Sequence, residues 1–205
     1  MKKKTVWAAA ASILLIGSLV FVVAYWLSNE PEAPSINQEL LDKEWVTAAY
    51  GKPALLLSTP RKLRPTFLEG EGPQNMTQYV RDARSYTFSQ GTDLSILVNV
   101  VEYRPGINTN LQGAVEGAIY TLGQQPGVNN LTHTSEGIQI DGFKGQRIQG
   151  QYQMKEKEFA FANVLLADSS HLWQVTVIYP AEDESGAAIT DRIVASVRID
   201  PPGKY

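Results

Sequence analysis

The chain has 205 residues, with 18 Lys and Arg against 21 Asp and Glu, a net charge of −3, and no cysteine. The lack of cysteine excludes disulfides, a thiol nucleophile, a thiolate metal site and the lipid-bearing Cys of a bacterial lipoprotein anchor. The part of the chain after residue 28 carries 15 basic and 21 acidic residues. This net negative charge argues against nucleic acid or an anionic lipid surface as the main partner.

The N-terminus predicts a membrane anchor. Lys2–Lys4 precede an uncharged, mostly apolar run, Thr5–Leu27, and about 20 helical residues are enough to cross a bilayer core. Because Lys and Arg mark the cytoplasmic side, residues 1–4 form a cytoplasmic tail, residues 5–27 a single-pass signal anchor, and the rest lies outside the cytoplasm. A cleaved signal peptide is the lesser alternative, because its apolar region is usually only about 7–15 residues long and ends in small residues.

A short spacer at residues 28–35, polar and proline-bearing, separates the anchor from one extracytoplasmic domain at residues 36–205. The first expected elements of this domain are a helical stretch at Ile36–Leu41 and a strand at Ala54–Leu57. The stretch Thr59–Asn75 holds three prolines and two glycines and predicts a long loop.

The middle of the chain gives the clearest strand and helix. Asp93–Tyr103 is rich in β-branched residues and apolar on both faces for most of its length, which predicts a central strand covered on both sides. A helical stripe of apolar residues follows between Leu111 and Leu122, with Asn110 as its N-cap and Gly123 as its stop.

A series of antiparallel hairpins is expected next. Asp141-Gly142 is a strong two-residue hairpin signal. In Arg147–Gln153 the polar residues alternate with Ile148 and Tyr152, which predicts a strand with one solvated face. Two further turns lead into the apolar strands; the turns are Lys155–Lys157 and Asp168–Ser170, and the strands are Phe159–Leu166 and Leu172–Tyr179.

A second helix closes the domain. Ile189, Ile193 and Val197 form its apolar stripe, and Asp183–Ser185 supply capping and negative charge at its start. The order of strand, helix, hairpins and helix predicts an α+β domain built on an antiparallel sheet.

This pattern resembles the PsbP-like superfamily, which includes bacterial DcrB-type envelope proteins. The residues that carry the resemblance span roughly 50 to 200; they are Gly142, Gly145, Arg147, Gly150 and Tyr152, the strand Phe159–Leu166, the run Leu172–Val177, and a terminal helix ending in Ile193–Ile199. The resemblance implies an antiparallel sheet flanked by helices, an α/β/α sandwich. It also implies a non-enzymatic binding or assembly module, with no catalytic residues to carry over.

The motifs that could carry catalysis or bind a metal are weak. His171 stands beside Asp168, Ser169 and Ser170, but residues within one tight turn do not supply the geometry of a catalytic triad, so an exposed hairpin tip is expected. His133 has no neighbours at metal-ligand spacing. We therefore expect no cofactor and no metal.

A locally basic zone is the first candidate contact site for an anion or a partner; it consists of Arg61, Lys62, Arg64, Arg81 and Arg84. The solvated face of Arg147, Gln149, Gln151 and Gln153 is a second, weaker candidate.

The sequence favours a membrane-anchored, extracytoplasmic binding or assembly module of the bacterial envelope with a protein partner and no catalysis of its own. A small-ligand carrier and a carboxylate-based envelope hydrolase are the alternatives. An apolar cavity would favour the carrier, and paired carboxylates with raised pKa values would favour the enzyme.

Overall fold

The computed structural model describes residues 38–66 and 78–200, and every structural statement below concerns these residues. The expected anchor at Thr5–Leu27, the spacer and most of the expected loop lie outside them. Within the two described ranges, no helix has both the length and the apolar character needed to span a membrane.

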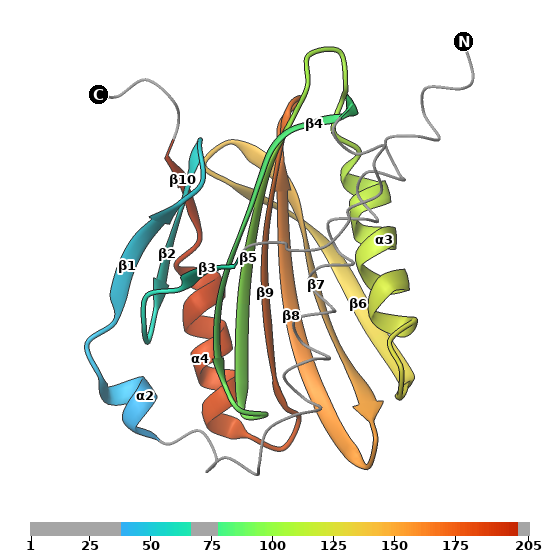
Figure 1. Cartoon of the computed structure of the whole chain (residues 1–205). Coiled ribbons are helices and arrows are strands. Elements are labelled where there is room, and N and C mark those ends of the chain that lie inside the picture. The colour runs from blue at the N-terminus through green and yellow to red at the C-terminus, as the bar shows by residue number, and fades with distance from the viewer. Residues whose placement is uncertain (1–37, 67–77, 201–205) are drawn as a thin grey trace.

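The described chain forms two antiparallel sheets and three helices (Figure 1). The small sheet has the order β1-β2-β10, and its strands are β1 (Val46–Tyr50), β2 (Ala54–Thr59) and β10 (Arg198–Asp200). The large sheet has seven strands in the order β3-β4-β5-β9-β8-β7-β6. These are β3 (Arg64–Thr66), β4 (Val80–Gln90), β5 (Leu94–Tyr103), β6 (Val128–Ile140), β7 (Phe143–Met154), β8 (Lys157–Ala167) and β9 (His171–Pro180). The helices are α2 (Gln38–Asp42), α3 (Leu111–Gly123) and α4 (Glu184–Ala195).

Two layers cover opposite faces of the large sheet, because successive side chains of a strand point to opposite sides. On one face, α4 and the small sheet bury a cluster that includes Trp173, Val175 and Val177 of β9. On the other face, α3 packs over a second cluster that includes Ile148 and Tyr152 of β7. Figure 1 shows α4 with the small sheet on one side and α3 on the other. The expected antiparallel sheet flanked by helices is therefore confirmed.

Local signals place the turns and helix ends where the sequence predicts them. Asp141 and Gly142 adopt positive φ angles of 49° and 87° between β6 and β7, as a two-residue hairpin turn requires. The side chain of Asn110 accepts a hydrogen bond from the Gly113 N–H at 3.0 Å and caps α3. Asp183 caps α4 by accepting from the Ser185 N–H at 2.9 Å.

The short helix α2 is held directly to α4. The Arg192 guanidinium of α4 lies 4.0 Å from the centroid of the Trp45 ring, a cation–π contact, and also donates a hydrogen bond to the Leu41 carbonyl at 3.2 Å. The Trp45 indole N–H in turn donates to the Leu40 carbonyl at 3.0 Å. The beginning of the described chain is thus tied to its last helix.

Three segments differ from the sequence-based expectation. The expected loop Thr59–Asn75 contains β3 at Arg64–Thr66, which pairs with β4 despite Pro65, because edge strands tolerate proline. The expected terminal helix through Ile199 ends at Ala195, and Arg198–Asp200 form β10 because their backbone pairs with β2. The long strand β4 carries too many polar residues to be recognised by its pattern.

Candidate functional site

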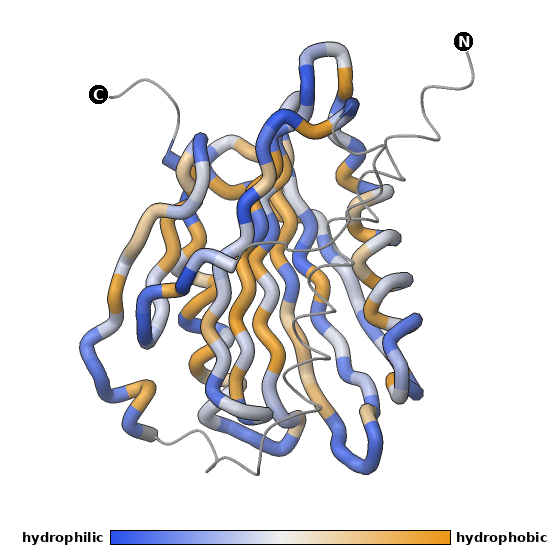
Figure 2. The backbone as a smooth tube through the Cα atoms, in the orientation of Figure 1, coloured by the Kyte–Doolittle hydropathy of each residue, from blue (hydrophilic) through white to orange (hydrophobic). Residues whose placement is uncertain are grey.

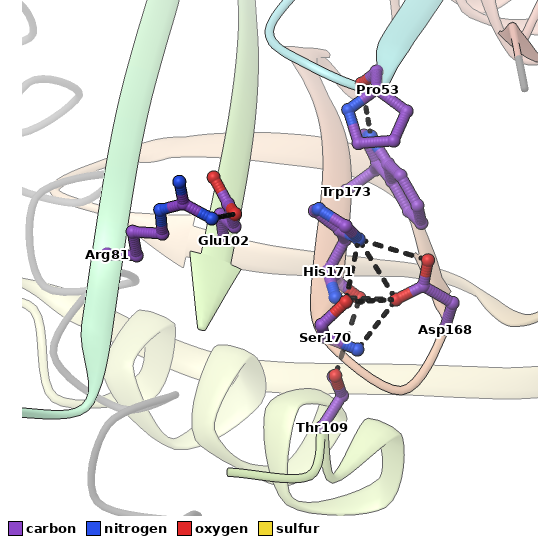
Figure 3. Close-up of polar contacts among 8 residues, drawn as sticks. All are labelled: Pro53, Arg81, Glu102, Thr109, Asp168, Ser170, His171 and Trp173. Carbon is purple, nitrogen blue, oxygen red and sulfur yellow. Dashed lines mark hydrogen bonds and ion pairs between the residues drawn. The ribbon is translucent and has the colours of Figure 1, made fainter. Parts of the chain in front are cut away.

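The turn between β8 and β9 gathers the polar residues that resemble catalytic groups (Figure 3). The Asp168 carboxylate accepts hydrogen bonds from the backbone N–H groups of Ser170 and His171 at 2.7 and 2.6 Å, and it lies 3.0 Å from the His171 Nδ1. The His171 ring stacks on Trp173 with a centroid distance of 5.4 Å. Of the turn residues 168–171, Ser169 is exposed and the other three are half-buried, so the expectation of an exposed hairpin tip holds for Ser169 alone.

This geometry does not activate a nucleophile. In a catalytic triad the carboxylate and the serine occupy opposite nitrogens of the imidazole, so that one orients the ring while the other gives up its proton. Here the Ser170 hydroxyl, 3.1 Å away, and the Asp168 carboxylate both contact Nδ1 of His171. The carboxylate satisfies the backbone of its own turn, so its role is structural.

Replacing Asp168 by alanine is expected to lower the free energy of unfolding by about 1–2 kcal/mol, since two backbone donors lose a charged acceptor. Burial opposes ionisation of Asp168, but hydrogen bonds from Ser170 and His171 outweigh it and hold the pKa of the carboxyl below its ordinary value. The ionised carboxylate therefore stabilises the fold above about pH 4, and this contribution is lost as the pH falls through the folded-state pKa. Urea denaturation should show a smaller difference in the free energy of unfolding between wild type and Asp168→Ala at acidic pH than at neutral pH. Ser169→Ala is the control and should change stability by less than about 0.5 kcal/mol.

The structure divides the basic zone into paired and unpaired cations. Arg81 donates to Glu102 of β5 at 2.8 Å (Figure 3), and Arg84 donates to Asp82 at 2.8 Å. The other three basic residues are exposed, and no acidic partner lies within ion-pair distance of them in the described chain; they are Arg61, Lys62 and Arg64. The zone is thus a three-residue basic segment beside two neutralised arginines, and its role in anion binding stays a prediction.

Two carboxylates approach each other at the end of the sheet that carries the β4–β5 turn and the start of α4. Burial raises the pKa of Asp93, and the nearby Asp183 raises it further, while Lys157 lowers it. Each aspartate has one buried oxygen without a hydrogen-bond partner. Asp183 already caps α4, however, and Asp93 is only 7 % exposed, so a substrate has no direct access to the pair. The arrangement fits a structural contact better than hydrolysis.

No group of three or more metal-ligating side chains is placed to hold an ion within residues 38–66 and 78–200. His133 is exposed on β6, opposite Gly150 of β7.

The most distinctive open surface is the outer edge of β6. This strand has 13 residues and ends the large sheet, where it pairs with β7 and with no other described strand. From Thr132 to Ile140 its register with β7 is unbroken, and a bulge at Asn130, with φ of 53°, separates this stretch from the start of the strand. The stretch contains no proline and no lysine, and Glu136 is its single charge.

The face of β7 next to this edge is solvated, as its alternation predicts. Gln149, Gln151 and Gln153 are exposed, whereas Ile148 and Tyr152 on the opposite face are buried. Thr132 and Thr134 of β6 continue this uncharged polar surface to the edge, because Thr132 pairs with Gln151 and Thr134 with Gln149. Figure 2 shows hydrophilic and neutral colours over much of β6 and β7, in contrast to the hydrophobic strands in the middle of the sheet. The fourth member of the expected strip, Arg147, is half-buried and 3.5 Å from Asp191 of α4.

Sequence reasoning identified the solvated strand but not the edge. The polar run Asn129–Gln139 carries alternating Thr and Ser that indicate a strand, yet no local signal says that this strand is last in the sheet. That position follows from the order of all seven strands.

No protein-family model and no curated protein sequence matches the chain. Among solved structures, LpqN of Mycobacterium tuberculosis, a protein involved in cell envelope biogenesis, aligns with 14 % identity and a TM-score of 0.49 over 83 % of this chain and 100 % of its own. CyanoP, the cyanobacterial PsbP of Synechocystis, aligns with 12 % identity and a TM-score of 0.54 over 84 % of this chain and 99 % of its own. The kinship to DcrB-type proteins stays a prediction, whereas the likeness to CyanoP shows that the domain has a PsbP-like fold.

Proposed function

We propose that this protein is a membrane-tethered, extracytoplasmic module that holds an extended segment of an envelope protein by strand addition at β6. The observation that carries the proposal is the open edge of β6 from Thr132 to Ile140. A free edge offers a row of backbone N–H and C=O groups that an added strand satisfies, and several families of binding domains recognise peptides in this way.

The edge lacks the features with which proteins usually prevent such pairing. Natural sheets protect their edges by short strands, prolines, lysines or bulges. The opposite edge strand, β3, has three residues and contains Pro65, so it is protected. β6 is long, and its bulge at Asn130 leaves nine consecutive pairs beyond it regular. The contrast within one sheet supports a binding role for β6.

The tether limits where the partner lies. Residues 28–35 reach at most about 25–30 Å when extended, so a domain anchored through Thr5–Leu27 stays close to the bilayer. The net acidic domain disfavours binding to anionic lipid itself, which leaves a protein partner near the membrane as the better candidate.

The proposal assigns no catalysis to the domain. Both contacts of the His171 ring nitrogen serve the β8–β9 turn, and the Asp93–Asp183 pair is buried and committed to a helix cap. A carboxylate-based hydrolase is therefore less well supported than a binding module.

A photo-crosslinking side chain at Thr134, in the full chain within native membranes, is expected to give an adduct with a protein partner. The same group at Tyr120, exposed on the outer surface of α3, is the matched control and should give none.

Neighbouring residues of an antiparallel strand direct their N–H groups alternately to the paired strand and outward. One of the variants Thr134→Pro and Ser135→Pro should therefore keep its thermal stability. With the crosslinker moved to Thr132, that variant should lose the adduct.

Three results would contradict the proposal. The first is equal adducts from Thr134 and Tyr120. The second is an adduct that persists in the stable proline variant. The third, which concerns the tether, is recovery from the membranes of a mature protein that begins after Leu27.

A further inference from the structure

The open stretch of β6, Thr132–Ile140, carries a pattern of side chains that restricts which segment can pair with it. In an antiparallel sheet, residues directly opposite each other lie on the same face, and their side chains interact. The register with β7 therefore assigns each residue of the stretch to one face of the large sheet. A strand added at the edge has to match both faces.

On the α4 face, Glu136 ends a row of alternating charges. Asp191 of α4 lies 3.5 Å from the Arg147 guanidinium, and Arg147 of β7 is directly opposite Glu136. Glu136 is exposed and forms no ion pair with any residue of the described ranges. The next position beyond it belongs to the added strand. A cation there continues the alternation, whereas an anion would stand directly opposite Glu136, which is unfavourable.

On the α3 face, Gly137 leaves an open space at the edge. A Cβ at this position would meet no atom within 4 Å. Its neighbours on the same face of β6, Ser135 and Gln139, are exposed. An aromatic side chain on an adjacent strand can cover the backbone of such a glycine, and aromatic residues rescue glycines at sheet edges in this way. The added strand therefore gains from a tyrosine or phenylalanine opposite Gly137.

The residues on either side of this pair differ in polarity. Ile138, on the α4 face, is half-buried against the core cluster of Trp173, so an aliphatic side chain opposite Ile138 extends an apolar surface. Thr134, on the same face, is exposed opposite Gln149, where a hydroxyl side chain fits. All neighbouring strands of the large sheet are antiparallel, so an antiparallel added strand continues the sheet and passes Ile138 before Thr134.

A second copy of β6 fits this edge less well than a basic segment does. Glu136 is the middle residue of the nine in Thr132–Ile140. Antiparallel pairing of all nine residues with the same stretch of another molecule would place Glu136 opposite its own counterpart, and like charges directly opposite each other destabilise a sheet. The 21 acidic residues after residue 28 outnumber the 15 basic ones, which also favours a basic partner.

Resting on the proposed strand addition, we infer that β6 selects an extended segment of its protein partner in which an aliphatic, an aromatic and a basic residue follow one another. They lie opposite Ile138, Gly137 and Glu136 in that order. The aliphatic and basic side chains share the α4 face, and the aromatic side chain lies on the α3 face, because successive side chains of a strand alternate.

The test is a titration of the full chain in detergent micelles with three synthetic peptides, followed through the backbone ¹⁵N–¹H NMR signals of β6. The first peptide is Val-Thr-Val-Tyr-Lys-Ser-Thr, with both ends blocked. The second has glutamate in place of lysine, and the third has threonine in place of tyrosine. The first peptide is expected to bind about fivefold more tightly than the second and about threefold more tightly than the third.

Three variants of the protein assign these preferences to single positions. Glu136→Lys should reverse the preference, so that the glutamate peptide binds more tightly than the lysine peptide. Glu156→Lys, in the exposed turn between β7 and β8, makes the same change of net charge and should keep the wild-type preference. Gly137→Val fills the space on the α3 face and should remove the advantage of tyrosine over threonine.

Failure of the inference is distinguishable from failure of the proposed function. Equal binding of the lysine and glutamate peptides, or of the tyrosine and threonine peptides, would overturn the inference and leave strand addition intact. So would the absence of peptide binding if a crosslinker at Thr134 still captures an envelope protein. Shifts of the β6 signals with protein concentration alone would overturn the inference by identifying a second copy as the occupant. Absence of both peptide binding and the Thr134 adduct would overturn the proposed function and the inference together.

Discussion

Replacing Trp173 by alanine is expected to lower the free energy of unfolding by about 3–5 kcal/mol, the range for large aromatic residues removed from a core. The Trp173 side chain of β9 is fully buried, and its indole N–H donates to the Pro53 carbonyl in the β1–β2 turn at 3.0 Å. Its ring meets Phe143 of β7 edge-on at 5.2 Å and stacks on His171. One side chain therefore joins the small sheet to two strands of the large sheet, and its loss leaves a cavity between the two.

Two further substitutions separate the causes of this effect. Trp173→Phe keeps most of the apolar contact but loses the hydrogen bond to Pro53. It should lower the free energy of unfolding by about 1 kcal/mol for the lost hydrogen bond, and by a further amount because the phenyl ring is smaller than the indole. Tyr120→Ala removes an exposed aromatic ring and should change stability by less than about 0.5 kcal/mol. Chemical denaturation of the three variants measures the differences. A loss for Trp173→Ala no greater than that for Tyr120→Ala would contradict the role given to Trp173.

Replacing Gly150 by alanine is expected to destabilise the domain by about 1–3 kcal/mol and to loosen β6. A methyl group at Gly150 of β7 would collide with the backbone oxygen of Thr132 on β6, and it would lie 2.8 Å from the Phe161 ring and 2.9 Å from the His133 Cβ. Because the obstacle on the β6 side is backbone, the strand itself has to move. Hydrogen exchange of the β6 amides should therefore accelerate more than exchange in β5.

Gly137→Ala provides the control within β6. A Cβ at Gly137 would meet no atom within 4 Å, and alanine restricts the unfolded chain more than glycine does. Its stability should equal or exceed that of the wild type. If Gly150→Ala behaves in the same way, close approach of the two strands is not the reason for glycine at position 150.

The elements that were predictable are those in which local pattern and tertiary environment agree. The stretch Asp93–Tyr103 appears as β5, with β4 and β9 on either side, because a strand buried on both faces is apolar at nearly every position. The helix α3 begins at Leu111 after its predicted Asn110 cap. The glycine predicted to stop it, Gly123, is its last residue, and Gln124 is the C-cap. The hairpin at Asp141-Gly142 follows from the positive φ angles that these residues tolerate.

The elements that were missed depend on partners far away in the sequence. β10 is a strand because Arg198–Asp200 pair with β2, whose residues lie more than a hundred positions earlier. β4 has a polar sequence because part of its surface is solvated, and its pairing with β5 makes it a strand. In such cases tertiary contacts override local propensity.

The candidate sites were partly visible in the sequence. The alternation of Gln149, Gln151 and Gln153 with Ile148 and Tyr152 predicted the solvated face of β7, but only the strand order shows that β6 beside it is the edge of the sheet. The basic zone was defined from neighbouring positions in the sequence, which gave no information on the ion pairs of Arg81 and Arg84.

The contact of Arg192 with Trp45 has a mechanical consequence for a tethered domain. A force that reaches the domain through residues before Gln38 acts first on α2, which is held to α4 by the Arg192 contacts. The load is thereby shared with the last helix and does not fall on the first hydrogen bonds of β1 alone. If the domain is tethered as we propose, tension from the membrane would be shared between the Arg192 contacts and the small sheet.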